Sequence, residues 1–165
     1  MELSEIKIMN FRSIESICFS IRNYTSLIGA NNASKSTIFS AIDCFLNQVK
    51  PQLSDWKDNN YEEPIIIECL FESLQDWEST CPGVAGIVQD NKIHLRLVAS
   101  ADVDSSSVSV VYEARIREEQ IDGWSSGWKE LSKTIKDIAV EQGLTGANWR
   151  TVSNRERIKQ HLREN

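Results

Sequence analysis

The chain has 165 residues, of which 41% are hydrophobic and 25% are charged, and its formal net charge is −6. This length and composition are typical of one globular domain with a core of its own. The negative charge argues against nucleic-acid binding by the whole surface. The sequence also shows no apolar run long enough to cross a membrane and no secretory leader pattern, so we expect no membrane association.

Cysteine spacing bears on the compartment and on metal binding. The four cysteines lie far apart and form no Cys-x-x-Cys pair; they are Cys18, Cys44, Cys69 and Cys81. Reduced and mostly buried thiols fit this spacing better than disulfides do. We therefore expect a cytoplasmic protein without a structural zinc site.

Two strands are predicted at the N-terminus. Residues 2–10 carry apolar side chains that suit a strand, and residues 16–21 alternate between apolar and polar. Phe11, Arg12 and Ser13 interrupt the pattern between them. The sequence therefore predicts a hairpin-like pair of strands.

A phosphate-binding motif with one departure follows at residues 29–37. The P-loop pattern is G-x-x-x-x-G-K-[ST]. Gly29, Lys35 and Ser36 stand at the required spacing, but Ser34 occupies the position of the second glycine.

The flanks of this motif match those of a P-loop. Residues 24–28 form a short strand-like run. Apolar residues after the loop recur at helical spacing, at Ile38, Ala41, Ile42, Phe45 and Leu46. The order of strand, glycine loop and amphipathic helix predicts a P-loop fold. The alternative is a Gly/Asn/Ser turn that happens to precede a helix.

The physics of a P-loop assigns roles to these residues. Successive backbone N–H groups form a concave nest for the β-phosphate, and the following helix adds its positive N-terminal end. Lys35 would reach the β- and γ-phosphates, and the Ser36 hydroxyl would ligate Mg²⁺.

Ser34 leaves two outcomes open. Glycine is used where backbone must approach a ligand closely or adopt a conformation that a Cβ disfavours. A serine side chain at this position would point toward the phosphates or shift the loop. The loop therefore either binds nucleotide weakly or has lost binding and kept the fold. The intact Lys35 and Ser36 favour retained binding.

The middle of the chain is predicted to be mostly β-structure. The expected elements are a loop at 48–63, a strand at 64–72, a short helix at 73–79, a turn at 82–83, and strands at 92–100 and 108–116 joined by a hairpin loop at 102–107. These strands would form an antiparallel set.

The C-terminal part is predicted to be helical. Trp124 and Trp128 are interpreted as a packing patch, with base stacking as a minor alternative. A helix is expected over 128–142, and a capping box at 153–156 starts a last helix. The basic residues within 150–163 could meet DNA, although a solvated helix is the preferred interpretation.

Two strings in the first part of the chain carry a family resemblance. Ile6-Lys-Ile-Met-Asn-Phe-Arg-Ser13, followed by Ile28-Gly-Ala-Asn-Asn-Ala-Ser-Lys-Ser-Thr37, resembles the N-terminal ATPase segment of the ABC-type SMC and RecF proteins. The chain is most similar to the OLD (overcoming lysogenization defect) family of ATP-dependent endonucleases, because of the paired Asn31 and Asn32. The resemblance is specific over residues 2–47. It implies an α/β fold with α+β character, namely the first lobe of an ABC-type ATPase with an antiparallel β-subsheet and flanking helices.

The resemblance also implies a role for each motif residue. Arg12 would lie near the nucleotide phosphates or base, and Asn31 would approach the γ-phosphate. Lys35 would bind the β- and γ-phosphates, Ser36 the Mg²⁺, and Thr37 the α-phosphate. The implied ATP-binding set is Arg12, Gly29, Ala30, Asn31, Asn32, Ala33, Ser34, Lys35, Ser36 and Thr37. A simpler interpretation makes Arg12 a surface residue at a strand end and gives the two asparagines turn chemistry.

Other parts of such an enzyme are missing from the sequence. There is no hydrophobic run that ends in Asp-Glu, no Leu-Ser-Gly-Gly segment and no cluster of carboxylates for a Toprim nuclease. We therefore expect no nuclease centre in this chain and no efficient ATP hydrolysis by the chain alone. It would be a fragment of a longer protein or a truncated gene product.

These observations lead to one functional hypothesis with two rivals. Residues 1–150 are expected to form the ATPase lobe, and 151–165 to start a helical, dimerisation segment. The lobe would bind ATP and Mg²⁺, form a homodimer or higher oligomer, and control DNA cleavage by the full-length protein in phage defence or DNA repair. The first rival is a non-binding P-loop domain that serves as a scaffold for a defence partner. The second is a DNA-binding protein that needs no nucleotide.

Overall fold

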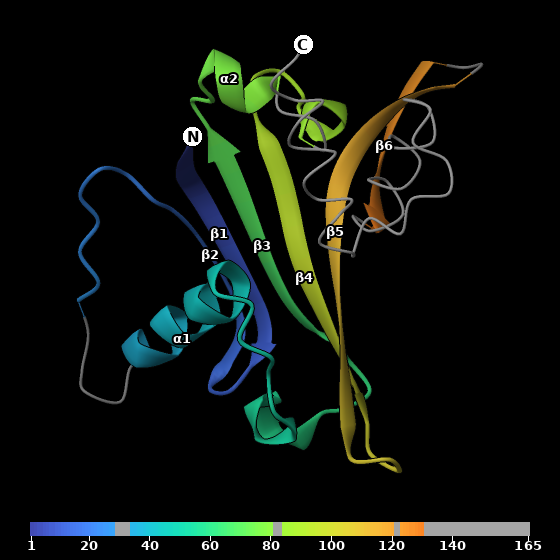
Figure 1. The fold of residues 1–165 in the computed structure, drawn as a ribbon. Coiled ribbons are helices and arrows are strands. Elements are labelled where there is room, and N and C mark those ends of the chain that lie inside the picture. The colour runs from blue at the N-terminus through green and yellow to red at the C-terminus, as the bar shows by residue number, and fades with distance from the viewer. Residues whose placement is uncertain (29–33, 81–83, 121–122, 131–165) are drawn as a thin grey trace, which may run out of the picture.

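An antiparallel sheet with one helix packed on its face forms the centre of the computed structural model (Figure 1), which describes residues 1–28, 34–80, 84–120 and 123–130. The described sheet has six strands in the order β2-β1-β3-β4-β5-β6. The elements are β1 (Glu2–Phe11), β2 (Ile14–Ser20), α1 (Lys35–Leu46), η1 (Leu53–Asp55), η2 (Lys57–Asn59), β3 (Ile65–Glu72), α2 (Asp76–Ser79), η3 (Ala85–Ile87), β4 (Ile93–Asp102), β5 (Ser107–Gln120) and β6 (Gly123–Glu130).

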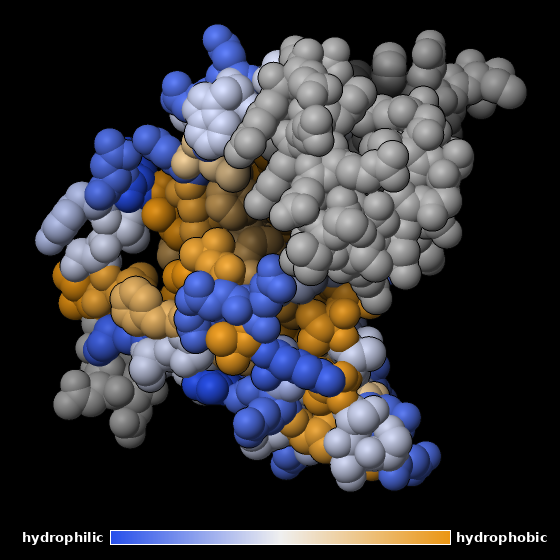
Figure 2. Space-filling view, in the orientation of Figure 1, coloured by the Kyte–Doolittle hydropathy of each residue, from blue (hydrophilic) through white to orange (hydrophobic). Residues whose placement is uncertain are grey.

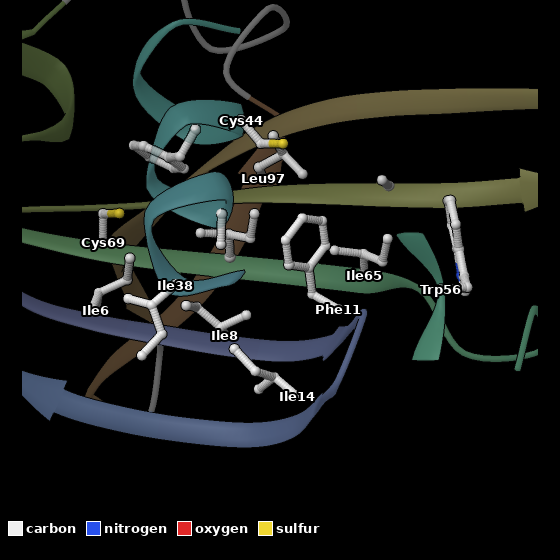
Figure 3. Close-up of a cluster of buried hydrophobic side chains, with 14 of the residues drawn as sticks. Ile6, Ile8, Phe11, Ile14, Ile38, Cys44, Trp56, Ile65, Cys69 and Leu97 are labelled. Atoms are coloured by element: carbon white, nitrogen blue, oxygen red, sulfur yellow. The ribbon is translucent and has the colours of Figure 1, made fainter. Parts of the chain in front are cut away.

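The main core lies between α1 and the sheet face that it covers (Figure 3). Because strand side chains alternate between faces, every second residue of β1 and β3 points to α1. Ile8 pairs with Ile67, which in turn pairs with Leu97 of β4, and all three are fully buried. The helix contributes Ile38, Ala41, Cys44 and Phe45 from one side. Each large apolar side chain buried in this way stabilises the fold by about 1.5–3 kcal/mol.

The opposite face of the sheet, which we call the outer face, carries a row of charges. Lys7 of β1 pairs in register with Glu68 of β3, and Glu68 pairs with Arg96 of β4. Arg96 in turn pairs with Glu113 of β5, to which its Nε donates a hydrogen bond. Opposite charges directly across strands stabilise a sheet, so this face is held together by alternating charge. Trp128 of β6 packs on this row, with its ring 4.3 Å from the Arg96 guanidinium.

Most elements expected from the sequence are confirmed. The N-terminal hairpin, the helix after the P-loop and the strand expected at 64–72 all form, as do the two strands joined through residues 102–107. The short helix expected within 73–79 is α2. The expected loop at 48–63 contains the two short 3-10 helices η1 and η2.

Two secondary-structure predictions are wrong. Residues 24–28 form no strand, and the side chains of Tyr24 and Ile28 are 88% and 94% exposed. Strand propensity reflects packing against neighbouring strands, and none of the described strands pairs with this segment. Residues 128–130 belong to β6 rather than to a helix, because β6 pairs with β5 in register. The turn at 82–83, the rest of the helix expected to 142, the capping box at 153–156 and the segment 151–165 lie outside the described residues.

The charge row on the outer face predicts an acid-sensitive stability. His94, whose Nε2 lies 3.6 Å from Glu68 Oε2, lowers the pKa of the Glu68 carboxyl together with the charge of Lys7. The stability that Glu68 contributes is therefore present above its unfolded-state pKa and is lost as pH falls through the folded-state value. We expect Glu68→Gln to flatten the fall in the free energy of unfolding between about pH 5 and pH 3, measured by urea titration.

The exposed Glu15 on β2 offers a matched control. With Glu15→Gln, the free energy of unfolding should fall with decreasing pH as steeply as in the unmodified chain. An equal flattening by both substitutions would contradict the role given to Glu68.

Candidate nucleotide-binding site

The chain is left-handed at Ser34, immediately before α1. Ser34 is the N-cap residue and has φ 60° and ψ 10°, in the left-handed region. A residue with a Cβ pays roughly 1–2 kcal/mol for this conformation, whereas glycine adopts it readily. The chain thus keeps, at the position of the second P-loop glycine, a backbone conformation suited to glycine.

The side chain of Ser34 is directed to the β1–β2 turn. Its Oγ lies 2.7 Å from the Oγ of Ser13, and Ser13 Oγ lies 3.4 Å from Thr37 Oγ1. Ser34 makes no side-chain cap to the helix, and the first turn of α1 has no acidic residue. The first N–H groups of a helix have no intrahelical acceptor and attract anions. This helix end is therefore suited to a phosphate.

The structure brings together the predicted site residues that it describes. Lys35 is half-buried, Ser36 is exposed and Thr37 is buried, all in the first turn of α1. Arg12 lies on the side of the same helix, since its Nη1 donates to Ser40 Oγ over 2.9 Å. Residues 29–33 of the predicted set lie outside the described residues.

Asn10 to Ser13, the string that carries the family resemblance, has a structural task at each position. The Asn10 amide donates to the backbone carbonyls of Asn60 and Glu63, and Phe11 is fully buried in the core. Arg12 and Ser13 form the two-residue connection between β1 and β2 and contact α1. The string therefore ties the hairpin to the helix that follows the P-loop.

Sequence reasoning missed the partners of Arg12. Its Nε donates to Oδ1 of Asp55 over 2.8 Å, and its backbone N–H donates to the Asp55 carbonyl over 2.6 Å. Asp55 lies in a polar segment whose sequence gives no periodic signal. Its neighbour Trp56, an apolar residue within that polar run, was the one available sign of a buried turn, and it is 2% exposed.

An open pocket of about 470 Å³ lies beside this arrangement. Its walls come from the β1–β2 connection, from α1 and from the segment that follows α1, and include Arg12, Ser40, Asp43, Lys50, Gln52 and Asp55. Both signs of charge are present, so the pocket is polar and has no single electrostatic preference.

The outward side of α1 differs from this pocket in polarity. Phe39 and Leu46 are 63% and 52% exposed. Figure 2 shows apolar residues both on the helix and on the sheet face beside it.

Neither a membrane span nor a carboxylate-rich metal centre is present in the part of the chain that the structure describes. No helix there is both long and apolar enough to cross a membrane. The same residues contain no group of three or more His, Cys, Asp or Glu that could hold a metal ion.

The fold and the start of α1 define a P-loop ATPase lobe built on an antiparallel sheet with few helices. The model of the family described as "AAA ATPase domain" matches residues 1–163. The chain therefore belongs to the AAA ATPase domain family, and the fold class expected from the sequence is confirmed.

A curated relative supports the resemblance found in the first part of the chain. The chain is 34% identical over 76 residues to the Old nuclease of Escherichia phage P2. The matched part is 46% of this chain and 13% of the Old nuclease. The chain thus covers a small part of that relative's length.

One solved structure also matches most of the chain at low identity. It belongs to work on SMC ATPases that concerns their ATP-driven dimerization and DNA-stimulated activation. It is 12% identical with a TM-score of 0.49, and the match covers 91% of this chain and 84% of that chain. The assignment to the family rests on the family model.

The left-handed Ser34 predicts a difference between two substitutions. Ser34→Ala removes the hydroxyl that contacts Ser13 and keeps the Cβ, whereas Ser34→Gly removes both. Because only glycine relieves the backbone strain, Ser34→Gly should have a free energy of unfolding about 1 kcal/mol higher than Ser34→Ala. Denaturant titration of the two variants measures this difference. Equal stability, or a more stable alanine variant, would show that residue 34 is not held in the left-handed region.

Proposed function

We propose that residues 29–37 bind ATP with Mg²⁺, and that the chain is the nucleotide-binding lobe of an OLD-like ATPase. One observation carries this proposal. The helix α1 begins with Lys35, Ser36 and Thr37 directly after a left-handed residue, and no acidic side chain stands in its first turn to repel phosphate. Membership of the AAA ATPase domain family supports the same assignment.

Each described residue has a proposed task in binding. The first N–H groups of α1 hold a phosphate, and the Lys35 ammonium neutralises the β- and γ-phosphates. Ser36, which is exposed, offers its hydroxyl to the magnesium ion. Bound magnesium neutralises charge on the β- and γ-phosphate oxygens. Arg12 adds a second positive charge beside the same helix turn.

Regulation of DNA cleavage is the proposed biological task. The Old nuclease relative is named for nuclease activity, and the chain matches 13% of it. We place the cleavage centre and the DNA contact outside this lobe, in the full-length protein. ATP-dependent association of two lobes would then pass the nucleotide state to that centre, in phage defence or in DNA repair.

A scaffold without nucleotide binding is the second candidate function. The observation that favours it is Ser34, whose Cβ occupies a position suited to glycine and whose hydroxyl already contacts Ser13. In that case the P-loop fold would be kept as an assembly surface for a defence partner.

Calorimetric titration of the chain with MgATP tests the proposed function. We expect saturable binding that Lys35→Ala weakens by at least about tenfold, because the lysine is the main counter-charge of the phosphates. Lys92→Ala is the matched control: it removes the same charge at a residue paired with Glu72, far along the chain from the P-loop. Absence of binding at millimolar ATP, or an equal loss of affinity in both variants, would contradict the proposal.

A second titration separates a weakened site from a lost one. Ser34→Gly removes the side chain next to the phosphate nest, so the affinity for MgATP should rise above that of the unmodified chain by about tenfold. If neither protein binds, the scaffold candidate is supported. A DNA affinity that falls steeply with salt in the absence of nucleotide would instead support a DNA-binding protein.

A further inference from the structure

Asp55 is a buried carboxylate outside the P-loop motif. It is 8% exposed, although it lies in a short 3-10 helix within a polar segment. Buried charges need partners of opposite charge and hydrogen bonds. Asp55 has both: Oδ1 accepts from Arg12 Nε over 2.8 Å, and Oδ2 accepts from the Gln52 backbone N–H over 2.8 Å.

The backbone of Arg12 is fixed by the same segment. Arg12 has φ 51°, in the left-handed region, and its N–H donates to the Asp55 carbonyl. The neighbouring Phe11 forms an isolated antiparallel bridge with Trp56. Asp55 therefore holds Arg12 at two points, one on the main chain and one on the side chain.

The far end of the Arg12 side chain reaches α1. Its Nη1 donates to Ser40 Oγ, and Ser40 Oγ donates to the carbonyl of Ser36 over 3.0 Å. A guanidinium is planar, so fixing Nε and Nη1 fixes the orientation of the whole group. A continuous series of contacts therefore runs from Asp55 through Arg12 to the first turn of α1.

We propose that Asp55 is the positioning residue for Arg12, and that through Arg12 it sets the affinity of the site for the nucleotide phosphates; the second part rests on the proposed function. The Arg12 side chain is 43% exposed, so without Asp55 it would sample many rotamers in water. The conformational entropy lost when a ligand orders the Arg12 side chain would then oppose binding.

A competing role for Asp55 would have the opposite sign. The carboxylate could neutralise Arg12 and reduce its attraction for phosphate, in which case removing the charge would tighten binding. The geometry favours positioning, because Asp55 contacts Nε while the terminal Nη1 is already directed to α1.

A double-mutant cycle in the 165-residue chain tests this proposal. The proteins are the unmodified chain, Asp55→Asn, Arg12→Gln and the double variant, each titrated with MgATP. We expect each single substitution to weaken binding about fivefold or more, and Asp55→Asn to add nothing once Arg12 is replaced. Asp43→Asn is the matched control, since Asp43 lines the same pocket but accepts from Asn47; it should bind as the unmodified chain does.

Two results of the cycle would overturn the proposal. One is tighter binding by Asp55→Asn, which would indicate competition. The other is an equal loss in the presence and absence of Arg12, which would indicate a general structural role. If Asp55→Asn fails to fold, Ser40→Ala takes its place in the cycle, because it releases Nη1 at the exposed end of the contact series.

A measurement without nucleotide separates this inference from the proposed function. NMR of the Arg12 Nε–H in the unliganded chain should show slow exchange with water, unchanged in Asp43→Asn and fast in Asp55→Asn. Fast exchange in the unmodified chain would overturn the positioning of Arg12 by Asp55. If exchange is slow in the unmodified chain and fast in Asp55→Asn, and no MgATP binds, the positioning of Arg12 by Asp55 is supported and the nucleotide function is excluded.

Discussion

The segment Asn10–Ser13, which ends β1 and forms its connection to β2, is the constraint on which the rest of the structure depends. Within four residues, it places an amide on the carbonyls of residues 60 and 63, a phenyl ring in the core, a guanidinium against Asp55 and a hydroxyl against α1. Two of its residues, Asn10 and Arg12, adopt left-handed backbone conformations. These strained conformations persist because the surrounding contacts determine them. These contacts help to hold α1 on the sheet, and with it residues 34–37 at its start.

The serine at position 34 shows how a departure from a motif can be absorbed locally. Its backbone keeps the left-handed geometry, and its hydroxyl is satisfied by Ser13 in the same connection. The side chain is therefore accommodated by the hairpin, and Ser36 in the first turn of α1 stays exposed. A fold and the activity of a site built on it are separable properties, so family membership alone does not decide activity.

Local patterns predicted much of this fold, because they depend on near neighbours in the sequence. The alternation in β1, β2, β3, β4 and β5 and the 3.6-residue spacing of α1 were sufficient to place those elements. Residues 24–28 and 128–130 could not be assigned in the same way, since strand formation there depends on whether a neighbour pairs with them. The fixed spacing of the P-loop motif pointed to Gly29, Lys35 and Ser36, and these site residues stay a prediction. No sequence pattern pointed to Asp55, because its contacts with Arg12 form only when the fold brings the two residues together.

The row of alternating charge on the outer face of the sheet has a consequence for how the chain can assemble. Lys7, Glu68, Arg96 and Glu113 alternate in sign across four strands, and Arg96 forms an ion pair with Glu113. A protein docked there would remove these groups from water without offering better partners, and that desolvation is unfavourable. The α1 side carries Phe39 and Leu46 in solvent, where burial is favourable. Among the described residues, the two faces of one sheet are thus chemically unequal.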